Sequence, residues 1–109
     1  MATHILMVHT RPAPGQEAAY HHWYDDFHLD EVLQVPGFVA ARRLRLLPEP
    51  EPDGPPLGPG SHLALFTVES DDIDATRELF RQARKSMEIP SCLDPSSVAL
   101  SWWRALGPA

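Results

Sequence analysis

The side chains best suited to chemistry lie close together in the sequence, between Tyr20 and Glu31. In a helix each residue advances about 100°. One arc of this stretch then carries aromatic rings, an imidazole and a carboxylate, which belong to Tyr20, Tyr24, Phe27, His28 and Glu31. Trp23 lies beside this arc. Burial in an apolar wall lowers the proton affinity of an imidazole, and a nearby carboxylate, here Asp25 or Glu31, raises it again. The pKa of His28 can therefore be tuned toward neutrality, which suits general acid/base catalysis.

The same pattern also fits a purely structural helix, in which the aromatic rings are core and His28 bonds a backbone carbonyl. A metal site is not predicted, because His21 and His22 are adjacent and His28 lies seven residues from His21, whereas metal ligands on one helix face recur every three or four residues. The pairs Asp25-Asp26 and Asp71-Asp72 indicate helix solvation and capping, since neighbours in sequence do not face each other.

Motifs that anchor phosphate-bearing cofactors or a serine nucleophile are missing from the sequence. It has no glycine-rich phosphate loop, no GxSxG elbow and no GxGxxG after the first expected strand. We therefore expect any catalysis to proceed without a bound cofactor or metal.

Length and charge restrict the possible partners. A chain of 109 residues is predicted to form a single domain spanning 1–109. The formal net charge of -6 disfavours nucleic acid and anionic membrane surfaces. The basic cluster Arg42, Arg43 and Arg45 fits either an interface ion-pair set or a carboxylate clamp. A single cysteine, Cys92, and the lack of a signal segment or membrane-spanning run favour the cytoplasm.

Apolar periodicity and breaker residues predict the order βαββαβ. Strands are expected at 4–9, 38–47, 62–69 and 98–106, and helices at 16–33 and 73–87. Residues 48–60 hold six of the twelve prolines, so they are interpreted as a mobile loop within the domain. In strand 38–47, alternation puts Arg43 and Arg45 on one face and Leu44 and Leu46 on the other.

This order predicts an α+β, ferredoxin-like fold, with a four-stranded antiparallel sheet and both helices on one face. The other sheet face would be bare and apolar, and a second copy of the chain is the economical cover for it. We expect such a homodimer to enclose an apolar pocket beside His28.

Two segments of the sequence resemble the EthD-like branch of the dimeric α+β barrel superfamily. They are Trp23-Tyr24-Asp25-Asp26-Phe27-His28-Leu29 and Val35-Pro36-Gly37-Phe38, and the resemblance covers about the first 47 residues. It implies dimerisation through the open sheet faces and a pocket between helix and sheet into which His28 points. Asp30 stands where relatives often have proline, and the 48–60 loop is longer than a plain hairpin.

The residues and the resemblance together suggest a lyase or cyclase that dehydrates or cyclises a small aromatic or polyketide-like substrate. His28 would move the proton, Tyr24 and Asp25 would orient the substrate, and an apolar wall would come from Tyr20, Trp23, Phe27, Phe38 and Trp102. Trp102 and Trp103 project to opposite faces of their strand, so at most one of them lines the pocket. A non-catalytic binder of a hydrophobic intermediate and a cofactor-independent monooxygenase are the alternatives.

Overall fold

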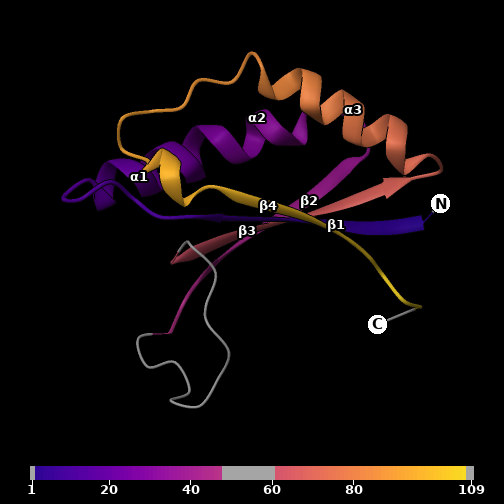
Figure 1. Ribbon diagram of the computed structural model, residues 1–109, viewed down its shortest axis with the longest axis horizontal. Coiled ribbons are helices and arrows are strands. Elements are labelled where there is room, and N and C mark those ends of the chain that lie inside the picture. Colours follow the sequence, from indigo (N-terminus) through magenta and orange to yellow (C-terminus); the bar gives the residue numbers. More distant parts are fainter. Residues whose placement is uncertain (1, 48–60, 108–109) are drawn as a thin grey trace.

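Four antiparallel strands form one sheet, and the helices cover one face of it (Figure 1). The computed structural model describes residues 2–47 and 61–107. The strands, which pair in the order β2-β3-β1-β4, are β1 (Ala2–Thr10), β2 (Phe38–Arg45), β3 (His62–Ser70) and β4 (Ala99–Arg104). This order confirms the ferredoxin-like prediction. The proline-rich loop predicted at 48–60 lies outside the described residues.

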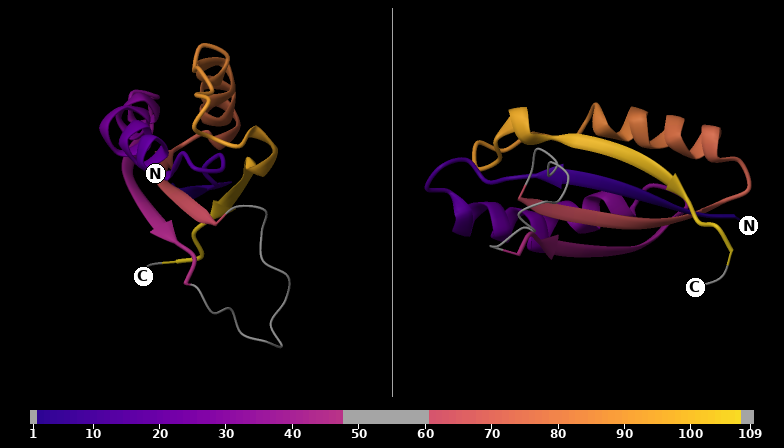
Figure 2. Two further views of the ribbon diagram at one scale, coloured as in Figure 1. Left: turned by 90° about the vertical axis from the view of Figure 1, so that its left-hand side faces the viewer. Right: turned by 60° about the horizontal axis from the view of Figure 1, so that its bottom comes forward.

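The helical layer has two parts, which lie on the same side of the twisted sheet (Figure 2). The first is a continuous run of α1 (Glu17–Trp23), a π-helical turn η1 (Tyr24–His28) and α2 (Leu29–Leu33). The second is α3 (Ile73–Arg84), whose N-cap Asp72 accepts a hydrogen bond from the Ala75 amide at 3.1 Å. Among the described residues, no helix is long and apolar enough to cross a membrane.

The core lies between the sheet and the helices. Alternate residues of β1 and β3 point toward the helices and are buried, as Leu6, Phe66 and Val68 illustrate. Side chains of the first helical run, such as Tyr20 and Val32, meet them from above. Burial of apolar surface in this layer is what holds the first helix against the sheet.

The opposite face of the sheet carries the other residues of the alternation. Along β1 and β3 the outward positions are mostly uncharged: Thr3, Ile5, Met7, His9, Leu63, Leu65, Thr67 and Glu69. Trp103 of β4 also points to this side and is 55% exposed. The predicted alternation in β2 is present, with Arg43 on the helix side and Leu44 on the open side.

The turn Val35-Pro36-Gly37-Phe38 joins the first helical run to β2. Gly37 has a φ of +96°, a conformation that residues with a Cβ rarely adopt. Its carbonyl accepts a hydrogen bond from the Glu69 amide at 2.9 Å, which ties the turn to the end of β3. A Cβ at this position would lie 3.1 Å from the Glu69 carbonyl oxygen, so a side chain here would be strained by the backbone conformation and would also have to push this carbonyl aside by a few tenths of an ångström.

Replacement of Gly37 by alanine is expected to lower the free energy of unfolding by about 1–3 kcal/mol. Chemical denaturation followed by circular dichroism measures this loss. Gly15→Ala is the matched control, because Gly15 also has a positive φ, +76°, but no atom lies within 4 Å of its would-be Cβ. Equal losses in the two variants would show that the close contact with Glu69 adds nothing to the strain at Gly37.

Candidate functional site

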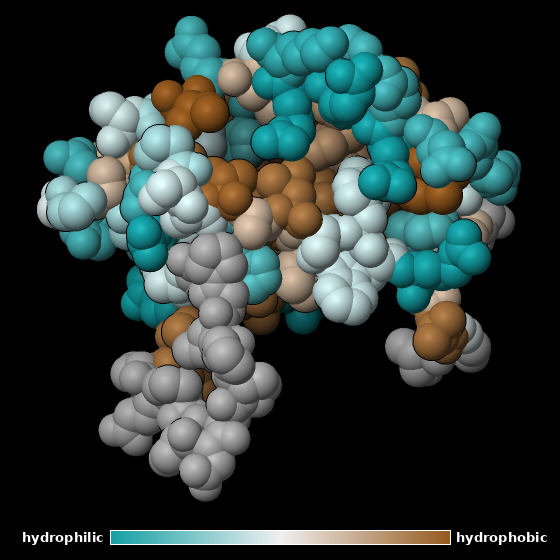
Figure 3. Space-filling model, in the orientation of Figure 1, coloured by the Kyte–Doolittle hydropathy of each residue, from teal (hydrophilic) through white to brown (hydrophobic). Residues whose placement is uncertain are grey.

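A cavity of about 130 Å³ lies between the helices and the sheet. Its floor is formed by apolar residues of three strands, Val8, Phe66 and Leu100, and its roof by Trp23, Tyr24 and His28 of the first helical run. On the face seen in Figure 3, apolar side chains gather between the two layers and hydrophilic ones surround them. The cavity therefore places an imidazole and a phenol at an apolar surface.

The π-helical turn brings Trp23 and His28 together. Their rings stack with centroids 4.3 Å apart and planes inclined by 16°. In a regular α-helix, residues five apart point about 140° away from each other, whereas the wider π turn aligns them. The same turn leaves Phe27 on the outside of the helix, 56% exposed and away from the cavity. A uniform α-helical period puts Phe27 on the same face as Tyr24 and His28. The π turn is the reason why the structure differs from that expectation.

His28 is held in one orientation by Glu31. Its Nδ1 lies 3.0 Å from Oε1 of Glu31, and both side chains are largely buried. Burial lowers the pKa of His28, and the Glu31 carboxylate partly opposes that shift. With Glu31 ionised, Nδ1 carries the proton and donates a hydrogen bond to the carboxylate. Nε2 then keeps a free lone pair, and no hydrogen bond within the described residues uses it.

Tyr24 stands edge-on to His28, with ring centroids 5.2 Å apart. Burial raises the pKa of Tyr24 to about 12. The phenol therefore stays protonated at neutral pH and acts as a hydrogen-bond donor, not as a base. The Thr10 hydroxyl forms a hydrogen bond with the hydroxyl of the fully buried Tyr20.

Asp25 is turned toward β2 and does not contact His28. Its Oδ1 accepts a hydrogen bond from Nη1 of Arg43 at 2.8 Å. The Arg43 guanidinium in turn lies over the Tyr24 ring, 4.5 Å from the centroid. Of the two carboxylates considered from the sequence, Glu31 is thus the one beside the imidazole, and Asp25 supports the far side of Tyr24.

The other expected wall residues lie around the cavity but do not line it. Tyr20 is fully buried behind Thr10. Phe38 belongs to the core, where its ring stacks on Phe80 with centroids 5.3 Å apart. Trp102 packs edge-on against both of these phenylalanines and lines a groove along α3. Among the five expected wall residues, the structure brings only Trp23 to the cavity.

Several cavity residues were not predicted from the sequence, because most of them follow α3 in an irregular segment. Met87, Ile89, Leu93 and Val98 close one side and Glu88 adds a charged group, while Arg84, the last residue of α3, adds another. No local motif marks them, because their position depends on how the segment returns to the sheet. The only available signal was that apolar residues persist after the helix, between Met87 and Leu93.

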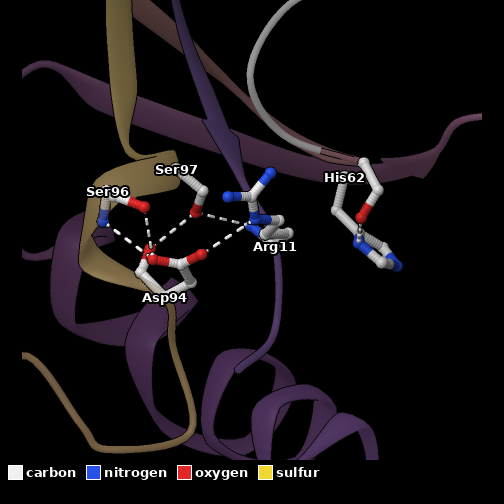
Figure 4. A network of polar contacts seen from close by, with 6 residues as sticks. Arg11, His62, Asp94, Ser96 and Ser97 are labelled. Atoms are coloured by element: carbon white, nitrogen blue, oxygen red, sulfur yellow. Dashed lines mark hydrogen bonds and ion pairs between the residues drawn. The ribbon is translucent and has the colours of Figure 1, made fainter. Parts of the chain in front are cut away.

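A polar network fixes this returning segment to the end of β1 (Figure 4). Nε of Arg11 donates to Oδ2 of Asp94 at 2.9 Å, and the Arg11 amide donates to Oγ of Ser97 at 2.9 Å. Asp94 also caps the short helix η2 (Pro95–Ser97) by accepting a hydrogen bond from the Ser96 amide. Contacts with Ser96 and Arg11 lower the pKa of Asp94. The network holds the wall that carries Leu93 and Val98.

The cavity lies on the helix-covered side of the sheet, opposite the bare face. Elements of one chain form the cavity walls that the structure describes, and the expectation that a second copy encloses the pocket stays a prediction. A partner on the open face would be separated from His28 by the thickness of the sheet. The pocket and the open face thus lie on opposite sides of the sheet.

The free energy of unfolding is expected to decrease as the pH falls below 6.5, the ordinary pKa of histidine. Burial lowers the pKa of His28, and burial also leads the causes that lower the pKa of His21 and His62. The unfolded chain then binds protons at a higher pH than the folded chain does. The contribution of these histidines to the free energy of unfolding is fully present above pH 6.5, and it is lost as the pH falls toward their lowered pKa values in the folded state. Urea unfolding over a pH series measures the slope.

His28→Gln should make this pH dependence shallower, because one of the three contributing groups is removed. His22→Gln is the control for loss of a histidine as such, since His22 is exposed and pairs with Asp26 on the helix surface. An unchanged slope in His28→Gln would contradict the burial of the imidazole.

Comparison with known proteins bears on the fold. No family model and no curated protein matches the sequence. A protein from Shewanella loihica PV-4 described as a "putative monooxygenase" aligns over 98% of this chain and 97% of its own, with a TM-score of 0.57 and 16% identity. An ethyl tert-butyl ether D (EthD) family protein from Bacillus halodurans C-125 aligns over 97% of this chain and 100% of its own, with a TM-score of 0.56 and 12% identity. The resemblance seen in the sequence therefore holds at the level of the fold.

Proposed function

We propose that this chain is an EthD-like enzyme that needs no cofactor and moves a proton on a small, hydrophobic, aromatic substrate. The observation that carries the proposal is the orientation of His28: Glu31 occupies Nδ1 at 3.0 Å, and Nε2 remains available beside an apolar cavity. A base of lowered pKa is largely unprotonated at neutral pH, as a general base must be. Its place of action would be the cytoplasm.

The reaction begins with an enolisable carbon next to a carbonyl group. Nε2 of His28 takes the proton as the C–H bond breaks, and the electron pair moves to the carbonyl oxygen. The Tyr24 hydroxyl, kept protonated by burial, donates a hydrogen bond to the enolate. In a dehydration, the imidazolium returns its proton to a β-hydroxyl group, which leaves as water while the carbon–carbon double bond forms.

Chemistry of the walls indicates the class of substrate. Apolar side chains dominate the lining, and Trp23 presents an aromatic ring already stacked on His28. Flat aromatic molecules gain the most binding free energy in such surroundings, through apolar burial and ring stacking. Asp25 takes a positioning role in this scheme, because its bond to Arg43 fixes a guanidinium under the Tyr24 ring.

The test uses 1-tetralone, a bicyclic aromatic ketone with an enolisable methylene group. The protein in D₂O is expected to accelerate exchange of the α-hydrogens, as followed by proton NMR. Saturable quenching of tryptophan fluorescence by the same ketone without faster exchange would instead favour the non-catalytic binder. If the protein neither binds nor exchanges this ketone or its hydroxylated naphthol and anthrone analogues, the proposal is overturned.

A cofactor-independent monooxygenase is the second candidate, favoured by the description of the Shewanella loihica relative in fold. Such an enzyme would convert the central methylene of anthrone to a ketone, with one oxygen atom of O₂ entering the product and the other leaving as water. Oxygen uptake with anthrone, measured with an electrode, distinguishes it from proton transfer alone.

Glu31→Gln is expected to shift the pH profile of 1-tetralone exchange to lower pH. The Glu31 carboxylate raises the pKa of His28, so its removal leaves the lowering effect of burial unopposed. The acidic limb of the rate profile, which follows deprotonation of His28, then moves down. Asp30→Gln, one residue away and exposed, is the control. A profile that stays in place in Glu31→Gln would refute the positioning role of Glu31.

We also propose that the chain is a homodimer joined through its open sheet face. The outward positions of the two central strands, from Ile5 and Met7 to Leu63 and Leu65, form an apolar surface that a soluble monomer would expose. Because these positions carry little charge, the same surface of a second copy fits against it. No role for nucleic acid or a membrane enters the proposal.

A further inference from the structure

A second cluster of polar side chains lies at the end of the sheet where β2 ends and β3 begins. Four basic residues from α1, β2 and β3 converge there around a shallow pocket of about 200 Å³: His21, Arg43, Arg45 and His62. Arg45 and His62 are directly paired across the two strands. None of the four lines the His28 cavity.

The cluster holds more hydrogen-bond donors than acceptors. Arg43 approaches Nδ1 of His21 at 3.1 Å, and Arg45 approaches Nε2 of the same ring at 3.3 Å. A neutral imidazole has one acceptor nitrogen and one N–H group. One of these two contacts therefore sets a guanidinium N–H against an imidazole N–H, a repulsive arrangement that an oxygen atom beside the two groups would relieve by accepting from both.

His62 adds an unpaired polar atom. Its Nδ1 is hydrogen-bonded to Oγ of Ser61, the residue before β3, at 2.9 Å, and Figure 4 labels His62 beside the Arg11–Asp94 network. Its Nε2 is buried and has no hydrogen-bond partner among the described residues. The His62 ring meets the His21 ring edge-on, with centroids 5.1 Å apart. A buried nitrogen without a partner costs free energy unless a ligand or water completes it.

Charge in the cluster is only partly compensated. Asp25 pairs with Arg43 at 2.8 Å. Arg45 has no carboxylate partner in the described part of the chain, where its hydrogen bond is to His21. Beside burial, the two guanidiniums contribute to the lowered pKa of both His21 and His62. Asp25 and Glu17 act on the pKa of His21 in the opposite direction, so two carboxylates offset part of this positive charge. Within the described residues, no hydrogen bond or ion pair joins either of them to Arg45.

We propose that this cluster binds a small oxyanion, a carboxylate or a phosphate group. Oxygen atoms of such an anion accept hydrogen bonds from both guanidiniums and from the imidazole N–H that now faces one of them. The site is distinct from the His28 cavity, because the Tyr20 ring stands between: it contacts the His21 and His62 rings at 5.2 and 5.3 Å. The proposal does not depend on the reaction assigned to His28.

Titration of the full chain with inorganic phosphate, and separately with acetate, at constant ionic strength tests the site. Imidazole signals in two-dimensional NMR are the readout. His21 and His62 are expected to shift in a saturable way and to titrate at higher pH with the anion bound, because a negative charge favours the imidazolium. His22 and His28 should not shift. Saturation by phosphate alone, by acetate alone or by both tells which oxyanion the site takes.

Arg45→Gln should weaken this binding at least tenfold, the effect of about 1.4 kcal/mol from one charge-assisted contact. Arg42→Gln is the matched control, since Arg42 is on the same strand, exposed and directed to the open face. Both variants should bind 1-tetralone as the parent chain does. Shifts that grow linearly without saturation, or equal weakening in the two variants, would overturn the proposal.

Discussion

Replacement of His28 by glutamine is expected to slow α-hydrogen exchange of 1-tetralone by a factor of about 10²–10⁴, the usual contribution of a positioned general base. Glutamine is close to histidine in volume and can keep a hydrogen bond to Glu31, so the cavity is preserved. It has no lone pair able to take a proton at neutral pH. The rate is measured by NMR in D₂O, and ketone binding by tryptophan fluorescence.

Two further variants determine how this result is interpreted. His22→Gln removes an exposed histidine of the same helix, whose partner is Asp26, and should leave the exchange rate unchanged. Tyr24→Phe removes only the hydroxyl that would stabilise the enolate and should slow exchange by about tenfold or more. If His28→Gln binds the ketone and exchanges its hydrogens as fast as the parent chain, His28 is not the base.

Element order was predictable because each boundary has a local cause. Pro36 and Gly37 end the first helical run, and Asp72 caps the second. The π turn was not predictable, because a single widened turn leaves no trace in apolar periodicity. This turn aligns Trp23 with His28 and turns Phe27 outward, so it decides the composition of the cavity roof.

The wall of the cavity was harder to predict than its roof. Periodicity puts Trp102 and Trp103 on opposite faces of their strand without telling which one faces the helices. In the structure Phe38 and Trp102 both lie on the helix-covered face. Periodicity also does not say how far along each strand the cavity is located. Both side chains pack against Phe80 instead. Met87 and Ile89 line the cavity wall that these two rings were expected to form. The choice between Asp25 and Glu31 was open for a similar reason, since it depends on Arg43 of a neighbouring strand.

Leu65→Glu is expected to convert the proposed homodimer to a monomer, with the dissociation constant raised at least about 100-fold. Leu65 lies on β3 and faces outward between Met7 of β1 and Arg42 of β2, near the middle of the open face. In a face-to-face dimer, each new carboxylate would be buried against apolar side chains of the partner. Sedimentation velocity over a concentration series measures the change.

Leu79→Glu is the control, because Leu79 is an exposed apolar residue on α3, on the other side of the sheet. It should remain dimeric, and circular dichroism should show that both variants are folded. A parent chain that stays monomeric at high concentration, or a Leu65→Glu variant that still dimerises, would refute this interface. Since one chain forms the cavity around His28, monomeric Leu65→Glu should still exchange the α-hydrogens of 1-tetralone. Loss of exchange in a folded monomer would mean instead that the partner contributes to the site.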